Sequence, residues 1–222
     1  MIMRTVIPMA TDTGDLMRLG QWLSPAFPVS SYAYSHGLEA EIAGGRVTEE
    51  RALEAWLATI LQAGAGRSDA ILLSAARDPA RDIDTVSDMA RALAGSRERL
   101  EETEAQGAAL SATLASLGHG DGIARPYPVA LGLAARALSL PAETVAALYL
   151  QAFVGNLVSV AVRFMPLGQA AGQAVLARLA PTIAAVAAEA SSAGLDGIGQ
   201  GAFAADLAAM EHETLDVRIY RT

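Results

Sequence analysis

The chain has 222 residues and a formal net charge of −8; 52% of its residues are hydrophobic and only 5% are aromatic. This length and apolar content suit one large domain with a sizeable core, and the wealth of alanine and leucine favours packed helices over sheets. An acidic chain without a basic cluster is a poor match for nucleic acid or an anionic membrane. The sequence has no cysteine and no lysine, which excludes disulfides, thiolate metal sites, a P-loop and Schiff-base chemistry.

Apolar residues recur at helical spacing along almost the whole chain, with breaks at glycine and proline. They predict helices at about residues 15–24, 31–43, 49–63, 68–77, 82–94, 96–110, 127–138, 141–164, 167–190 and 199–214. The helix at 96–110 begins with charged residues, and we expect it to run from solvent into the core. The sequence therefore predicts an all-α, single-domain bundle of roughly eight to ten helices.

The two ends of the chain differ from this helical body at 14–214. Residues 1–13 lack helical spacing and predict a flexible N-terminal arm, whose apolar run is too short for a signal peptide. We therefore expect a cytoplasmic protein. Residues 215–222 alternate apolar and polar side chains, which indicates an extended tail.

Residues 141–164 are apolar nearly all round and long enough to cross a membrane. Polar side chains interrupt the segment at Gln151, Asn156, Ser159 and Arg163. We therefore predict a buried central helix rather than a membrane span. Arg163 suits the end of that helix, where a cation interacts favourably with the helix dipole.

The stretch SPAFPVSSYAYSHGLEAE at 24–41 carries the densest set of reactive side chains. On a helix over 31–43, Tyr32, Ser35, His36 and Glu39 would share one exposed face. An enzyme could use His36 as the base, Glu39 to orient it and Ser35 as the nucleophile, but no nucleophile elbow or oxyanion hole accompanies them. Tyrosine beside polar residues also suits a protein-binding face.

Histidines are too few for an evident metal site. The chain has only His36, His119 and His212, and EHETLD at 211–216 lacks the second histidine of an H-E-x-x-H motif. We interpret His212 with Glu213 as a helix-surface pair and His119 as a solvated loop residue. On the residues alone, the chain is an acidic helical protein suited to binding partners.

Four blocks of the sequence together resemble the urease accessory protein UreF family. They are LGQWLSPAFPVSSYAYSHGLE at 19–39, SRERLEETEAQGAAL at 96–110, VRFMPLGQAAGQAVL at 162–176 and MEHETLDVRIYRT at 210–222. The third block matches P-L-(G/S)-Q-x-x-G-Q, and the fourth matches H-E-(S/T)-x-x-x-R-(L/I)-(F/Y). In the first block, Ser30 and Ser31 stand where the family often has glycine, and Ala33 where it usually has serine or threonine.

The resemblance implies an all-α homodimer that helps to activate urease and is not itself an enzyme. The family acts as an adaptor in nickel delivery: it binds a second accessory protein, UreD or UreH, which contacts apo-urease. It also recruits the nickel-carrying GTPase UreG and modulates its GTP-dependent cycle. No tightly bound cofactor or metal is expected, since nickel is the cargo and GTP is bound by the partner.

The resemblance also suggests which residues contact these partners. The GTPase face comprises Tyr32, Ser35, His36, Glu39 and Arg218; the UreD/UreH face comprises Leu215, Val217, Ile219, Tyr220 and Arg221. We expect the tail at 215–222 to be disordered alone and to become ordered on binding UreD/UreH; the alternative is an ordinary frayed terminus. We expect Arg163, Gln169 and Gln173 to have structural roles; a role in a partner interface or in the lining of a tunnel is the second alternative. Two alternatives stay open: a helical enzyme that uses His36, Glu39 and Tyr32, and a helical adaptor unrelated to urease. On physics alone, Tyr32 fits a core tyrosine equally well.

Overall fold

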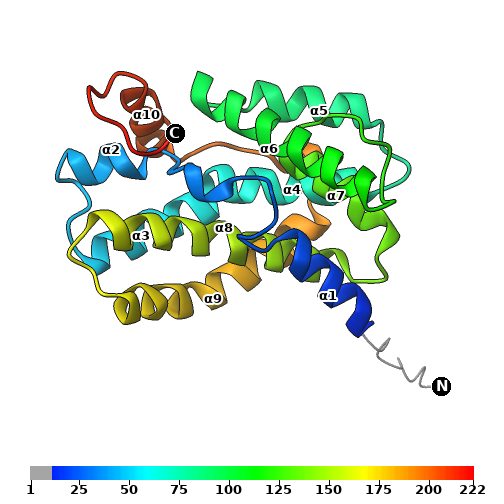
Figure 1. Cartoon of the computed structure of the whole chain (residues 1–222), viewed down its shortest axis with the longest axis horizontal. Helices are drawn as coiled ribbons and strands as arrows, with labels where there is room; N and C mark the ends of the chain where they lie inside the picture. Colours follow the sequence, from blue (N-terminus) through cyan, green and yellow to red (C-terminus); the bar gives the residue numbers. More distant parts are fainter. Residues whose placement is uncertain (1–11) are drawn as a thin grey trace.

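A computed structural model describes residues 12–222, and this part of the chain contains ten α-helices, three short 3-10 helices and no β-strand (Figure 1). The α-helices are α1 (Thr13–Trp22), α2 (Leu38–Ala43), α3 (Glu50–Ala63), α4 (Ala65–Arg77), α5 (Ile83–Ala92), α6 (Arg97–Ser116), α7 (Tyr127–Ala134), α8 (Ala142–Phe164), α9 (Gln169–Ser192) and α10 (Phe203–His212). The 3-10 helices are η1 (Ser31–Ala33), η2 (Ala135–Ala137) and η3 (Leu195–Gly197). The predicted all-α bundle is confirmed. Residues 1–11 of the predicted flexible arm lie outside the described part.

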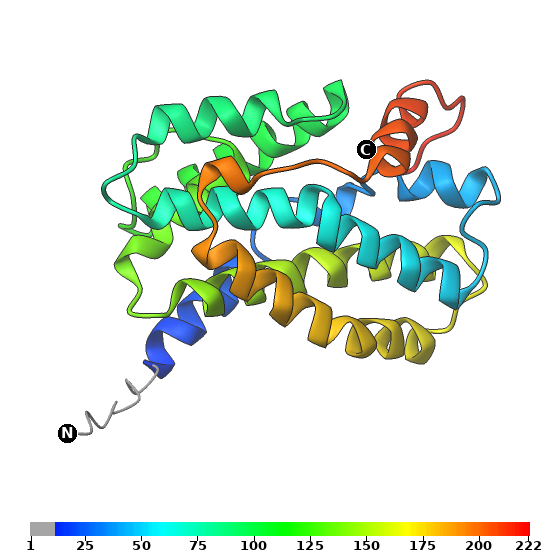
Figure 2. The ribbon, with the colours of Figure 1, turned by 180° about the vertical axis from the view of Figure 1, so that it is seen from behind.

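Helix α4 lies between the two sides of the bundle and contacts helices on both. The long helices α8 and α9 pack along each other, and α4 contacts both of them as well as α3, α5 and α7. Figures 1 and 2 show α8 and α9 along one side of the molecule and α5 along the opposite side. Helices α2 and α10 pack together at one end, away from α1.

Helix α8 is the predicted central helix, and its apolar side chains are used in the core. Leu150, Val154, Leu157 and Ala161 are each fully buried. By length and composition, α8 and α9 could each cross a membrane. Their packing against each other and against α4 explains this apolar character as that of core helices.

Several helices begin where the sequence provides an N-cap. The side chains of Asp12, Asp82 and Ser96 accept hydrogen bonds from the first-turn backbone N–H groups of α1, α5 and α6. Such caps satisfy donors that have no partner within the helix. Helix α1 therefore begins two residues before its predicted start, at Thr13.

The predicted helix over 31–43 is wrong. Residues 31–33 form η1, and α2 begins only at Leu38. Between them, His36 and Gly37 take left-handed backbone conformations with φ of 54° and 78°, which interrupts a right-handed helix. Ser30, at a position where glycine is often found in the resembled family, is also left-handed at φ 56°. Gly37 is doubly constrained, since a Cβ there would lie 2.7 Å from the backbone nitrogen of Ala209 in α10.

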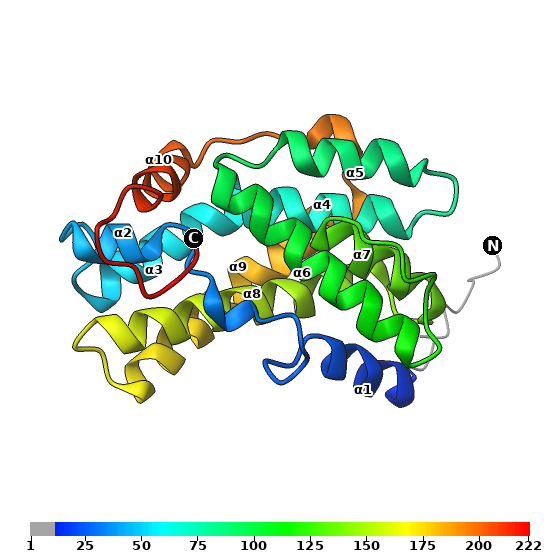
Figure 3. The ribbon, with the colours of Figure 1, turned by 45° about the horizontal axis from the view of Figure 1, so that its top comes forward.

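The tail after α10 folds back onto the protein, so the prediction of a tail that is disordered alone is also wrong. Figure 3 shows it looping from α10 past α2 towards α8. The backbone N–H of Arg221 donates to the carbonyl of Ala33 at 2.8 Å, and Ser35 N–H donates to the carbonyl of Thr222 at 2.9 Å. The Tyr220 ring packs on Phe164 with ring centres 5.5 Å apart.

Candidate partner-binding site

Buried polar side chains gather where the tail meets α2, α6 and α10. The group consists of Ser35, His36, Glu39, Glu98, Glu102, His212 and Thr222, each of them buried. Charged side chains are rarely buried without partners, because leaving water is costly for them. Their contacts form two clusters, one around His212 and one around Glu102.

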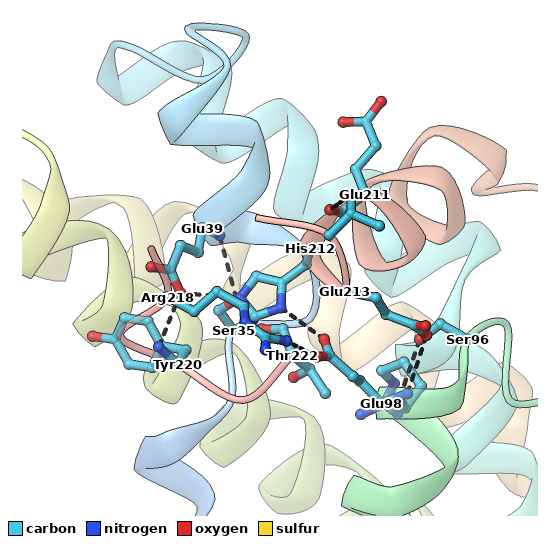
Figure 4. Close-up of polar contacts among 12 residues, drawn as sticks. Ser35, Glu39, Ser96, Glu98, Glu211, His212, Glu213, Arg218, Tyr220 and Thr222 are labelled. Carbon is cyan, nitrogen blue, oxygen red and sulfur yellow. Dashed lines mark hydrogen bonds and ion pairs between the residues drawn. The ribbon is translucent and has the colours of Figure 1, made fainter. Parts of the chain in front are cut away.

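The His212 cluster comprises Glu39, Glu98, His212 and Arg218 (Figure 4). The His212 ring lies between two carboxylates: Nδ1 is 2.7 Å from Glu98 Oε2, and Nε2 is 3.0 Å from Glu39 Oε2. Glu39 also accepts the backbone N–H groups of Ile219 and Tyr220, each at 2.9 Å. Arg218 Nη1 donates to Glu98 Oε1 at 2.6 Å. Both carboxylates thus hold the tail directly.

The start of α6 is fixed by the same region of the chain. Ser96 Oγ accepts the N–H of Arg99 at 3.1 Å, and Glu213 Oε1 accepts the N–H of Arg97 at 2.8 Å. An anion at a helix N-terminus is favourable because the free N–H groups there carry partial positive charge. Glu213 therefore ties the end of α10 to α6 and helps to place Glu98 beside His212.

The Glu102 cluster comprises His36, Arg99, Glu102 and Thr222. Glu102 binds Arg99 through a short ion pair, lies 2.8 Å from His36 Nε2 and accepts the Thr222 hydroxyl at 3.0 Å. Ser35 donates its hydroxyl to the Thr222 carbonyl, and Thr222 Oγ1 accepts the N–H of His36 at 3.2 Å. The last residue of the tail is therefore bound from several sides.

The charges of the Glu102 cluster are strongly coupled. Burial alone would raise the pKa of Glu102, but Arg99 and His36 outweigh it and lower that pKa from 4.5 to about 2. Burial, helped by the nearby Arg99 cation, lowers the pKa of His36. The His36 Nε2 lies 2.8 Å from the Glu102 carboxylate and 3.2 Å from Arg99 Nη1, and the guanidinium of Arg99 balances the charge of the carboxylate.

A cavity of about 330 Å³ lies beside the Glu102 cluster. One wall is polar and includes His36, Arg99 and Glu102; the other is aromatic and includes Tyr127, Tyr149 and Phe153, and Tyr32 and Arg163 also line the cavity. Tyr149 donates to Asp69 Oδ2 at 2.8 Å, and burial raises the pKa of that carboxyl. Among residues 12–222, no three acidic or histidine side chains are placed to hold a metal ion.

Comparison with known proteins decides the family. The family model of UreF matches residues 47–180. The chain belongs to the UreF family. A relative named urease accessory protein UreF from Jannaschia sp. (strain CCS1) is 62% identical over 213 residues, which cover 96% of this chain and 97% of that relative. UreF proteins from Cereibacter sphaeroides (strain KD131) and Ruegeria pomeroyi are 56% and 41% identical, over 93% and 96% of this chain and 98% and 100% of the relatives.

Of the residues expected on the GTPase face of this UreF chain, only Tyr32 and Arg218 are exposed. Tyr32 is 55% exposed on η1, so it is not a core tyrosine. Ser35, His36 and Glu39 are buried, and the expected exposed stripe is wrong for them. The left-handed backbone at His36 turns these side chains inward, where they bind the tail and α6.

The burial of these residues also keeps apart the side chains that the enzyme alternative would need together. The Ser35 hydroxyl donates to the tail, His36 lies against Glu102 and Glu39 faces His212. A nucleophile, base and orienting carboxylate would have to bond to one another in sequence. The three side chains instead have separate structural partners, so the geometry does not support the enzyme alternative.

The residues expected on the UreD/UreH face divide into exposed and anchoring groups. Val217 and Ile219 are 79% and 72% exposed, Leu215 is half-buried, and Arg221 is exposed. Tyr220 is buried against Phe164 and anchors the tail. The tail thus presents two large apolar side chains to solvent while its backbone is held in place.

The remaining predicted residues lie apart from the two clusters. Arg163 is exposed near the end of α8 and lines the 330 Å³ cavity, while Gln169 and Gln173 are exposed on α9 outside that cavity. The interpretation of His212 as a surface residue is wrong, because its side chain is fully buried. His119 is half-buried, with its ring centre 6.0 Å from that of Trp22, rather than simply solvated.

Sequence reasoning missed the acidic residues of α6. The charged start of that helix was expected in solvent, yet Glu98 and Glu102 are buried. Their spacing of four residues places both on one helix face, together with Gln106. The signal available in the sequence was this row of three hydrogen-bonding side chains at helical spacing.

Proposed function

We propose that this chain is an adaptor in urease maturation that bridges UreD/UreH-bound apo-urease and the nickel-carrying GTPase UreG and modulates its GTP-dependent cycle. It would act as a cytoplasmic homodimer, without a tightly bound cofactor, and with nickel as cargo. Membership of the UreF family supports the accessory role. The observation that carries the finer proposal is a tail held in a defined position with apolar side chains exposed.

The UreD/UreH surface of this proposal centres on Val217 and Ile219. Large exposed apolar side chains on an ordered segment are typical of contact residues, since their burial by a partner is favourable. The tail is already ordered by Glu39 and Glu98, so a partner would not have to order it on binding. Tyr220 serves as an anchor within the chain rather than as a contact.

The GTPase surface of this proposal centres on Tyr32, with Arg218 as a second contact. Tyrosine provides a large contact area at a small entropic cost, and it is common among residues that dominate binding energy. Arg218 is exposed although one of its nitrogens binds Glu98, and its other donors are available to a carboxylate of the partner. Ser35, His36 and Glu39 support these contacts from beneath.

Substitutions at exposed positions provide the test. Val217→Ser with Ile219→Ser should abolish capture by purified UreD/UreH, and Tyr32→Ala should weaken capture of UreG. Met17→Ser is the matched control, because Met17 is 71% exposed on α1, at the other end of the molecule. Each variant should also be assayed for urease activity in a host that carries the complete urease gene set with nickel supplied. Full binding and activity in both tested variants would refute the proposed surfaces.

Deletion of residues 215–222 is a less specific test of the UreD/UreH surface. We expect it to abolish UreD/UreH binding and to leave the dimer. The structure shows that it also removes bonding partners of four buried side chains, Ser35, Glu39, Glu98 and Glu102. Lost binding by the truncation therefore needs a check of folding, whereas retained binding on size exclusion would contradict the tail assignment directly.

A further inference from the structure

His212 has a hydrogen-bonding requirement that a neutral imidazole cannot meet. A neutral ring has one N–H group and one lone pair, so it can donate to one acceptor only. Both of its nitrogens lie within hydrogen-bond distance of carboxylate oxygens, at 2.7 Å from Glu98 and 3.0 Å from Glu39. In a neutral ring, one lone pair would therefore face a carboxylate lone pair in a fully buried site.

The charges around the ring also favour a proton on each nitrogen of His212. Glu39 comes from α2, Glu98 from α6 and Arg218 from the tail; together they sum to one negative charge around the ring. The two acidic neighbours of His212 in the chain bind elsewhere, since Glu211 pairs with Arg46 and Glu213 binds the start of α6. A proton on each nitrogen of His212 makes the cluster neutral, which is the favourable state for buried groups.

We infer that His212 is held as a doubly protonated imidazolium, and that this single charge keeps the tail in its docking position. The ring fixes Glu39, which accepts the backbone N–H groups of Ile219 and Tyr220, and it also fixes Glu98, which binds Arg218. One side chain on α10 thus orients both acceptors that hold the tail. His212 is a positioning residue for the exposed surface around Val217 and Ile219. That this surface binds UreD/UreH rests on the proposed function; the positioning of the tail does not.

Tail docking then depends on a proton. Removal of one proton from His212 would leave a net negative charge in the cluster and a lone pair opposite a carboxylate. Glu39 or Glu98 would turn away from the ring, and the hydrogen bonds to the tail would weaken. The Glu102 cluster would also lose a hydrogen bond, because Thr222 at the end of the tail binds Glu102.

The charge state can be measured directly on the full chain. A long-range ¹⁵N–¹H correlation spectrum at neutral pH should show one ring among the three histidines with both nitrogens protonated. That signal should disappear in His212→Gln and remain in His119→Gln. A His212 ring with a single protonated nitrogen would overturn the inference.

The positioning role has its own readout in amide hydrogen exchange. In His212→Gln, the amides of Ile219 and Tyr220 should exchange about tenfold faster or more, as expected when a charge-assisted hydrogen bond is lost from their acceptor. His119→Gln is the matched control and should leave both rates unchanged. Unchanged exchange in His212→Gln would refute the role.

A second variant keeps the inference testable if His212→Gln does not fold. Glu39→Gln preserves the side-chain shape but removes one carboxylate, so the His212 ring should become singly protonated and donate from Nδ1 to Glu98. A ring that stays doubly protonated in Glu39→Gln would contradict the charge argument. None of these measurements needs a partner protein. Protected tail amides together with absent UreD/UreH binding would therefore refute the proposed function and leave this inference intact.

Discussion

Glu102→Gln tests the electrostatic centre of the molecule. Glu102 is buried and binds Arg99, His36 and Thr222 at once. Glutamine has nearly the same shape but no charge, and its NH₂ group would face donors that now bind a carboxylate. The substitution therefore leaves the guanidinium of Arg99, whose side chain is only 14% exposed, with Asp69 as its remaining acidic partner, at 3.9 Å.

The expected cost can be estimated in two ways. Removing one partner of a buried ion pair typically costs about 3–5 kcal/mol. The depression of the Glu102 pKa from 4.5 to about 2 corresponds to about 3 kcal/mol, at about 1.4 kcal/mol for each pKa unit. We therefore expect Glu102→Gln to lower the free energy of unfolding by about 3 kcal/mol at neutral pH.

The pH dependence has a definite sign. The folded-state pKa of Glu102 is lower than its unfolded value, so its contribution is fully present above pH 4.5 and is lost as pH falls towards 2. The difference in unfolding free energy between the parent chain and Glu102→Gln should stay constant from neutral pH to about pH 5. It should then shrink as the pH is lowered further.

Urea denaturation, followed by circular dichroism at several pH values, measures this difference. Glu54→Gln is the control, because Glu54 pairs with Arg178 at 2.7 Å on the surface, where we expect a loss of less than about 1 kcal/mol. A Glu102→Gln variant as stable as Glu54→Gln at neutral pH would refute the assigned charges of the cluster. A difference that grew at acid pH would refute their sign.

Three further substitutions test packing and hydrogen bonding in urea or thermal melts. Gly107→Ala should cost several kcal/mol or prevent folding, because the new Cβ would lie 1.7 Å from the backbone oxygen of Arg125. Gly20→Ala, on α1 with no atom within 4 Å of the new Cβ, should instead stabilise the chain by up to about 1 kcal/mol; equal effects at the two positions would contradict this reasoning. Tyr149→Phe removes the hydroxyl that donates to Asp69 and should cost about 1 kcal/mol, and a more stable variant would show that this bond is not formed.

The sequence alone predicted the helical segments that depend on local patterns. The apolar spacing of 141–164 predicted the central helix α8, because a segment that is apolar nearly all round needs core contacts on every side. The charged start at residues 96–99 placed the beginning of α6 correctly, since the Ser96 cap acts within one turn. Both features involve neighbours along the chain, which a sequence displays directly.

The site depended on contacts that join distant parts of the chain. His36 has a left-handed backbone conformation that its immediate neighbours did not predict, and α10 packs directly against Gly37. His212 looked like a surface residue because its partners, Glu39 and Glu98, precede it by more than one hundred residues. Local periodicity and end caps therefore determined the helices of this chain. Tertiary packing alone decided which charged side chains are buried, because only packing brings their opposite charges within bonding distance.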